Sequence, residues 1–104
     1  MHPINVAETL VTPCFLAAEM GEMLFQLIQQ ELTMHNEIEI DFSGYHYVSE
    51  TFLYHSLGKV CLVNKFDEAA FKRKIHVTNF EVDDWEELEE VLDNVRIQLS
   101  VQQI

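Results

Sequence analysis

The sequence predicts one small α/β domain, in which helices pack on a mostly parallel or mixed sheet of about three or four strands. Strand patterns and helix patterns alternate along the chain, in the expected order β-α-β-α-β-α. Residues 37–65 form a strand, a tight Ser43–Gly44 corner and a helix, which is one half of a βαβ unit. A chain of 104 residues, 48% of them hydrophobic, is long enough for one core. We therefore expect a single domain over residues 1–104.

The N-terminal part is expected to be a strand followed by a long helix. Residues 4–10 are predicted as the first strand. Thr12 is a good N-cap, and Pro13 suits the first helical position because a proline there loses no hydrogen bond. Over residues 14–33, apolar side chains recur on one stripe at helical spacing: Leu16, Met20, Met23, Leu24, Leu27, Ile28 and Leu32.

The middle of the chain carries the clearest patterns. Residues 37–42 alternate between charged and apolar side chains, which is typical of a strand. A helix is predicted over residues 49–64, and Gly58 inside it indicates a close approach to the sheet. Asp67 can cap a short helix at residues 68–73. Residues 75–80 then alternate as a further strand.

Two structures are compatible with the C-terminal part. Asp83 and Glu86 form a capping box that begins a helix, with Trp85, Leu88, Val91 and Leu92 on its buried face. Beyond Asn94, alternate residues from 95 to 101 are apolar, which favours a strand, whereas residues 88, 92, 95 and 99 fit a longer helix. We favour a break near Asn94 and a final strand at residues 95–101. Such an edge strand could pair two copies into a homodimer.

Charge is the second strong feature of the sequence. Eighteen acidic residues oppose six basic ones, giving a net charge of −12. A surface this acidic repels phosphate backbones, so we expect no direct binding to nucleic acid. The acids gather into an acidic face, which is either a solvated helix surface or a docking surface for a basic partner. Its members are Glu81, Asp83, Asp84, Glu86, Glu87, Glu89, Glu90 and Asp93.

Several classes of function lack their motifs in this sequence. No glycine-rich nucleotide fingerprint and no metal-ligand spacing occurs, so we expect no cofactor, no metal and no catalytic residue. Cys14 and Cys61 fit no disulfide framework, and we expect both to be reduced and mostly buried. No signal region and no run of eighteen apolar residues occurs, which favours a soluble cytoplasmic protein without membrane contact. An enzyme using Asp41, His46 or Cys61 is a weaker alternative.

The loop over residues 41–51 is the strongest candidate for function, because binding groups gather at the carboxyl ends of strands in open α/β sheets. Two tyrosines flank a histidine in an expected exposed connection, and exposed aromatics often anchor interfaces. Ser49 and Thr51 stand at the start of the next helix, where they can cap it or accept a phosphate. The predicted partner-binding residues are Asp41, Ser43, Tyr45, His46, Tyr47 and Glu50.

The motif IDFSGYHYVSETFLYHSLGKV resembles the small STAS-like domains of bacterial proteins of unassigned function, and KIHVTN at residues 74–79 resembles a later strand of that family. The resemblance covers about residues 13–94 and extends, more distantly, to the anti-sigma-factor antagonists. It implies an α/β sheet fold and a regulatory, protein-binding role without a cofactor. In the antagonists, a kinase-like ATPase phosphorylates a serine of a D-S-S-G loop. That loop falls here on Ser49, Glu50, Thr51 and Phe52, so Thr51 is the hydroxyl at a matching serine position.

Two functions of different classes follow. The first is a non-enzymatic, STAS-like module that docks a protein partner, a kinase-like ATPase or another regulator, through residues 41–51 and the following helix, with phosphorylation at Thr51 or Ser49 as a switch. The second is a small acidic inhibitor, of a phage or a defence system, whose residues 81–93 imitate nucleic-acid charge and block a nucleic-acid-binding enzyme.

Overall fold

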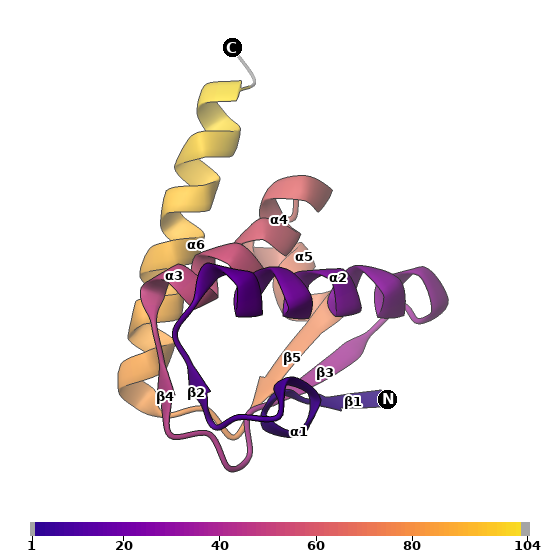
Figure 1. The fold of residues 1–104 in the computed structure, drawn as a ribbon. Helices are drawn as coiled ribbons and strands as arrows, with labels where there is room; N and C mark the ends of the chain where they lie inside the picture. Colours follow the sequence, from indigo (N-terminus) through magenta and orange to yellow (C-terminus); the bar gives the residue numbers. More distant parts are fainter. Residues whose placement is uncertain (1, 103–104) are drawn as a thin grey trace.

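The computed structural model describes residues 2–102 and shows a mixed α/β fold (Figure 1). Its main sheet has three parallel strands in the order β1 (His2–Asn5), β3 (Ile38–Asp41) and β5 (Ile75–Thr78). A second, two-stranded parallel sheet joins β2 (Cys14–Phe15) to β4 (Tyr47–Val48). The helices are α1 (Val6–Leu10), α2 (Ala18–Met34), α3 (Glu50–Leu53), the π-helix η1 (Tyr54–Gly58), α4 (Lys59–Asn64), α5 (Glu68–Lys74) and α6 (Val82–Gln102).

The main sheet has one apolar face and one polar face. Ile4, Ile40 and Val77 stand side by side in the parallel register; Ile4 and Ile40 belong to the core, as do Ile38 and Ile75 in the next row, and half-buried Val77 packs against it. The opposite face carries the intervening residues Pro3, Asn5, Glu39, Asp41, His76 and Thr78. Parallel sheets are usually covered on both faces, and their strands then read as continuous apolar runs. The alternation in residues 37–42 therefore reflects a sheet that is covered on one face only.

Several predicted elements lie where the sequence places them. The strands β3 and β5 fall within the predicted ranges, and the run from α3 through η1 to α4 matches the predicted helix at residues 49–64. Ser49 and Asp67 are N-caps whose side chains accept from the backbone N–H of Phe52 and Ala70. Within residues 2–102, no helix has the length and apolarity that crossing a membrane requires.

The prediction for the N-terminal part is wrong in two places. The strand ends at Asn5, because the Asn5 side chain accepts from the N–H of Glu8 and caps α1 where residues 6–10 were predicted as strand. Thr12 and Pro13 do not start a helix. Instead, Thr12 Oγ1 accepts from the N–H of Cys14, and the Pro13 carbonyl accepts from β4, so this segment becomes β2. The helix begins only at Ala18, after an N-cap without a side-chain hydrogen bond.

The prediction of a final strand at residues 95–101 is also wrong. α6 continues without a break from Val82 to Gln102, well past Asn94. It begins before Asp83, so Asp83 lies in the first turn of the helix and the prediction that it caps the helix is wrong. Leu88, Val91, Leu92 and Val95 are buried and Leu99 packs against the core, so the longer helical stripe decides the conformation. Because no strand exists there, the homodimer that was expected through it loses its structural basis.

Two glycines set the packing of the helices around η1. A Cβ on Gly21 of α2 would lie 2.8 Å from both His55 Cβ and the carbonyl oxygen of Phe52. A Cβ on Gly58 would lie 3.1 Å from Val91 Cγ1 of α6. Gly58 was expected to allow a close approach to the sheet, but the element that approaches it is another helix. α2 and α6 therefore both rest on the segment that follows the 41–51 loop.

Candidate functional site

The 41–51 loop begins with a turn that Asp41 organises. Asp41 Oδ1 accepts from the Ser43 N–H (2.9 Å), the Ser43 hydroxyl (2.7 Å) and Asn79 Nδ2 (2.8 Å). Asn79 reaches it from the end of β5, where φ is +57°. The Asn79 hydrogen bond is the main cause that lowers the pKa of Asp41, and Ser43 adds to it. The carboxylate therefore shapes the loop and stays ionised at neutral pH.

Tyr45 points into the protein and ties the loop to the start of α6. Its ring stacks on Phe15 at 6.4 Å between centroids and meets Phe42 edge-on at 5.6 Å. Its hydroxyl donates to Asp84 Oδ2 and accepts from the N–H of Glu81 (3.0 Å). Burial, and then the Asp84 hydrogen bond, raise the pKa of Tyr45 to about 12. Tyr45 thus lies inward, whereas the sequence suggested an exposed connection. Residues 41–45 are called the anchored half of the loop below.

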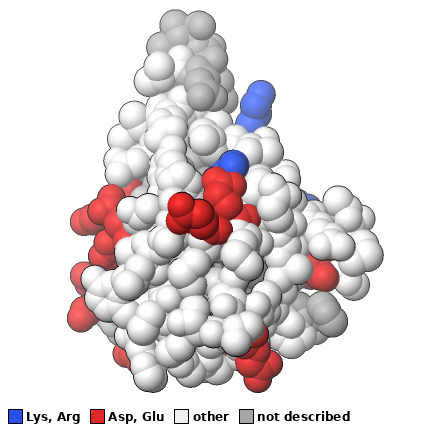
Figure 2. Space-filling view, in the orientation of Figure 1, with Lys and Arg blue, Asp and Glu red and all other residues white. Residues whose placement is uncertain are grey.

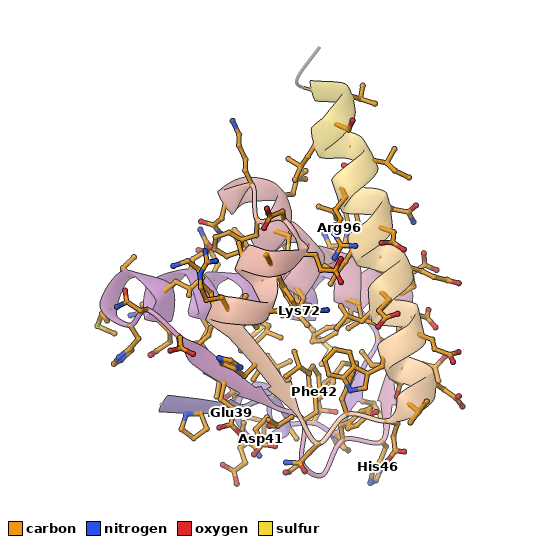
Figure 3. All side chains as sticks on the ribbon, turned by 180° about the vertical axis from the view of Figure 1, so that it is seen from behind. Glu39, Asp41, Phe42, His46, Lys72 and Arg96 are labelled. Carbon is orange, nitrogen blue, oxygen red and sulfur yellow. The ribbon has the colours of Figure 1, made fainter. Side chains whose placement is uncertain are left out.

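The rest of the loop, residues 46–51, is called the presented half, because four of its six side chains are exposed, while Val48 is buried and Ser49 is half-buried. His46 and Tyr47 are exposed, and 57% of Tyr47 is accessible. Their N–H groups donate to the Pro13 carbonyl (2.7 and 3.3 Å), which places Tyr47 beside Cys14 across the β2–β4 pair. Figure 3 shows His46 at the tip of the loop, directed away from the body of the protein. Cys14 is exposed, so its expected burial is wrong, while Cys61 is buried and both thiols are free.

The two candidate phospho-acceptors lie in different surroundings. Ser49 Oγ donates to the Leu16 carbonyl (2.8 Å) and accepts from the Phe52 N–H (3.0 Å), so it joins β2 to α3. Thr51 is exposed, and no hydrogen bond of its hydroxyl occurs within residues 2–102. Thr51 and Glu50 line a small hollow of about 220 Å³. The structure therefore separates a capping hydroxyl from an accessible one.

Two residues at this hollow were missed by the sequence analysis. Tyr54 and His55 complete its lining. They follow Thr51 by three and four positions, and this helical spacing could have identified them as neighbours. The ring of His55 is held by Glu22 of α2, whose carboxylate also accepts from Lys59 Nζ (2.6 Å). Lys59 and then His55 lower the pKa of Glu22. The hollow is thus bordered by a fixed ion-pair cluster.

The predicted acidic face is divided by the orientation of α6. Six of the eight acids are exposed, and acidic side chains gather over the lower half of α6 at the left edge of Figure 2, whereas Asp84 and Glu87 are half-buried. Asp84 instead turns inward to Tyr45. Glu89 and Asp93 border a groove between α6 and α5. The eight acids therefore do not form one uniform surface.

The groups considered for an enzyme do not share a site. Asp41 lines a shallow cavity with Glu8 and Glu31 beside β1. His46 is exposed at the loop tip, and Cys61 lies in the core, where burial raises its pKa to about 12. Among residues 2–102, no three side chains of His, Cys, Asp or Glu are grouped so that they could hold a metal ion.

Comparison with known proteins supports the resemblance that the loop motif suggested. A family model described as a STAS-like domain of unknown function matches residues 20–85, from α2 through the start of α6. No curated protein and no solved structure matches the chain. The matched segment contains the whole 41–51 loop, the main-sheet strands β3 and β5, and η1 with α3 and α4 on either side of it, but only the first residues of α6. The chain therefore belongs to the family of STAS-like domains of unknown function.

Proposed function

We propose that this domain is a non-enzymatic regulatory module of the cytoplasm that binds a protein partner through the presented half of the 41–51 loop. The observation that supports this most directly is the fixed display of Tyr47. An exposed aromatic side chain stands on a strand whose backbone is hydrogen-bonded to its neighbour. Such a residue loses little conformational entropy on binding and is a common interface anchor. Exposed Leu16, which follows β2, extends the apolar surface.

Thr51 is the better site for regulation by phosphate. Its exposed hydroxyl leaves it open to a kinase, whereas modification of Ser49 would remove its hydrogen bond to Leu16 and its cap on α3. A phosphate on Thr51 would add about two negative charges beside Glu50 at the docking surface. The partner would then be a kinase-like ATPase or another regulator, and phosphorylation would switch its binding.

Site-specific photocrosslinking in the native host tests the docking surface. A crosslinking amino acid replaces Tyr47 or Thr51, and Gln26, exposed on α2, provides the control position. We expect the same partner protein to be captured from both loop positions and not from Gln26. Capture of the same proteins from all three positions, or of none from the loop, would overturn the proposal. Mass spectrometry of the native protein should find phosphate on Thr51 and not on Ser49.

The exposed acids of α6 support a second candidate, an inhibitor that imitates nucleic-acid charge. Asp83, Glu86 and Glu90 all face solvent in a chain of net charge −12. Binding through this surface should weaken steeply between low and high salt. It should also be lost when Glu86 and Glu90 are replaced by glutamine. Binding through the presented half should depend on salt only mildly and should survive those replacements.

A further inference from the structure

A groove of about 500 Å³ lies between β5 and the helices α5 and α6, at the edge of the sheet that is opposite to the edge strand β1. Apolar side chains form its floor: Phe71, Ile75, Val77, Trp85 and Leu92. Charged side chains form its rim: Glu68, Lys72, Glu89, Asp93 and Arg96. Lys72 from α5 and Arg96 from α6 lie near one another between these two helices (Figure 3). The groove shares no lining residue with the presented half of the loop.

The strand beside this groove has a free edge. The Thr78 carbonyl accepts from the Phe42 N–H, so Thr78 directs its backbone groups toward β3. The backbone groups of alternate residues in a strand point to alternate sides, so His76 also faces β3 and Val77 faces the groove. β5 pairs only with β3 among the described strands. The N–H and carbonyl of Val77 and the carbonyl of Ile75 are therefore directed to the groove side of the sheet.

The other edge of the sheet, at β1, is protected against the addition of a further strand, whereas the edge at β5 is not. By the register of β1 with β3, Pro3 stands opposite Glu39, and its backbone faces away from the sheet. Proline has no N–H there, and proline on an outer edge is a common protection against strand addition. β5 carries no proline, and its edge lies next to an apolar groove instead of open solvent. The two edges of one sheet thus differ in their readiness to accept a further strand.

The charge around the groove selects the kind of segment that fits. The rim carries three carboxylates against two cations. Lys72 pairs with Glu68 and Arg96 pairs with Asp93, while Glu89 forms no ion pair within residues 2–102. Exposed Glu86 and Glu90 lie on the same helix as Glu89. A segment with basic flanks is therefore favoured over an acidic one.

We propose that this groove binds an extended segment of a partner protein by strand addition to β5. The segment carries apolar side chains at alternate positions, which enter the groove, and lysine or arginine at its ends, which meet Glu89 and the neighbouring acids. Main-chain hydrogen bonds to Val77 provide affinity, and the pockets for alternate side chains provide specificity. This site is independent of the docking surface on the 41–51 loop.

A random decapeptide display library, selected on the whole protein, provides the probe. Trp85 is the only tryptophan and lines the groove, so its fluorescence reports binding of the synthetic peptides that are selected. We expect alternating apolar residues with basic flanks to be enriched. N-methylation of alternate peptide nitrogens should abolish binding in one register and leave it nearly unchanged in the other, because only one set of N–H groups faces β5. This readout needs no change to the protein.

Two protein variants complete the test. Val77→Pro removes an outward N–H and should weaken binding about tenfold, the effect of one lost hydrogen bond. Glu89→Lys should weaken binding and reduce its salt dependence, while Glu87→Lys, the same charge change away from the groove, should not. Failure to enrich peptides, equal loss in both N-methylation registers, or an unchanged Trp85 signal would overturn the proposal.

Discussion

The two halves of the 41–51 loop are adjacent in sequence but are held in opposite ways. In the anchored half, the polar atoms of Asp41 and Tyr45 form hydrogen bonds within the protein. Their partners are Ser43, Asn79, Glu81 and Asp84. In the presented half, the Pro13 and Phe15 carbonyls hold the backbone, Val48 is buried and Ser49 caps α3, but the side chains of His46 and Tyr47 remain exposed. The difference shows that some polar and aromatic residues of a loop fix its conformation, while others form the surface that a partner can contact. Substitutions in the two halves should therefore separate stability from binding.

The largest separation is expected between the two tyrosines. Tyr45→Ala removes a ring that packs on Phe15, Phe42 and Phe80, together with both hydrogen bonds of its hydroxyl. It should lower the free energy of unfolding by about 3 kcal/mol, as large-to-small aromatic substitutions do. Tyr47→Ala, at an exposed side chain, should change stability by less than about 0.5 kcal/mol. Chemical denaturation measures both.

Partner binding should respond in the opposite way to stability, with the larger direct loss at Tyr47. Tyr47→Ala should remove partner capture while the protein stays folded. A Tyr47→Ala protein that keeps its partner, or a Tyr45→Ala protein that keeps its full stability, would break the distinction between the two halves.

The hydroxyl of Tyr45 allows a finer test of the anchored half. Tyr45→Phe keeps the ring but loses the hydrogen bonds to Asp84 and Glu81, and should cost about 1.5 kcal/mol. The pKa of Tyr45 is raised to about 12, so the neutral hydroxyl is the form that the folded state favours. Its contribution is therefore complete below about pH 10, the value for an unfolded tyrosine, and is lost as the pH rises toward 12.

Denaturation of wild type and Tyr45→Phe in parallel at several pH values measures this contribution, because other titrating groups cancel in the difference. A stability difference that stays constant from pH 9 to pH 12, or that is absent at pH 7, would show that the hydroxyl does not tie the loop to α6.

The hydroxyls of Ser49 and Thr51 provide a matched pair at the boundary between loop and helix. Ser49→Ala removes the cap on α3 and the bond to Leu16, and should cost about 1 kcal/mol. Thr51→Ala should leave stability within about 0.5 kcal/mol and abolish phosphorylation at this position. Thermal melts and phosphopeptide mass spectrometry check the two effects. Phosphate that persists on the Thr51→Ala protein at Ser49 would reverse the assignment.

The sequence predicted the parts of this site whose signals are local. Alternation over residues 37–42 identified β3, and Ser49 was recognised as a helix cap from its own neighbourhood. The matched family supports the α/β fold that the loop motif suggested. The sequence could not show which side chains of the loop point into the protein and which point to solvent. The inward position of Tyr45 depends on aromatic partners from β2 and from the end of β5, which are distant in sequence.

The errors arose where short elements take their structure from distant partners. β4 has two residues, too few for any periodicity, and exists because β2 pairs with it. Pro13 was predicted to start a helix from its immediate neighbours in the sequence, but its carbonyl accepts hydrogen bonds from the N–H groups of His46 and Tyr47. In α6, alternation and helical spacing both fitted residues 95–101, and burial of Val95 against the core decides between them.

The smallest effect, and the one most specific to the anchored half, is the charge on Asp41. Its pKa lies below the ordinary value of 3.8, chiefly because Asn79 donates to the carboxylate. A carboxyl group with a lowered folded pKa contributes stability above its unfolded pKa and loses it as the pH falls through the folded value. Wild type should therefore exceed Asp41→Asn slightly at pH 6, and the difference should disappear as the pH falls below about 4. In an Asn79→Ala background the difference at pH 6 should shrink, because the main donor to the carboxylate is gone. A difference that persists unchanged at low pH would show that the charge of Asp41 is not what stabilises the loop.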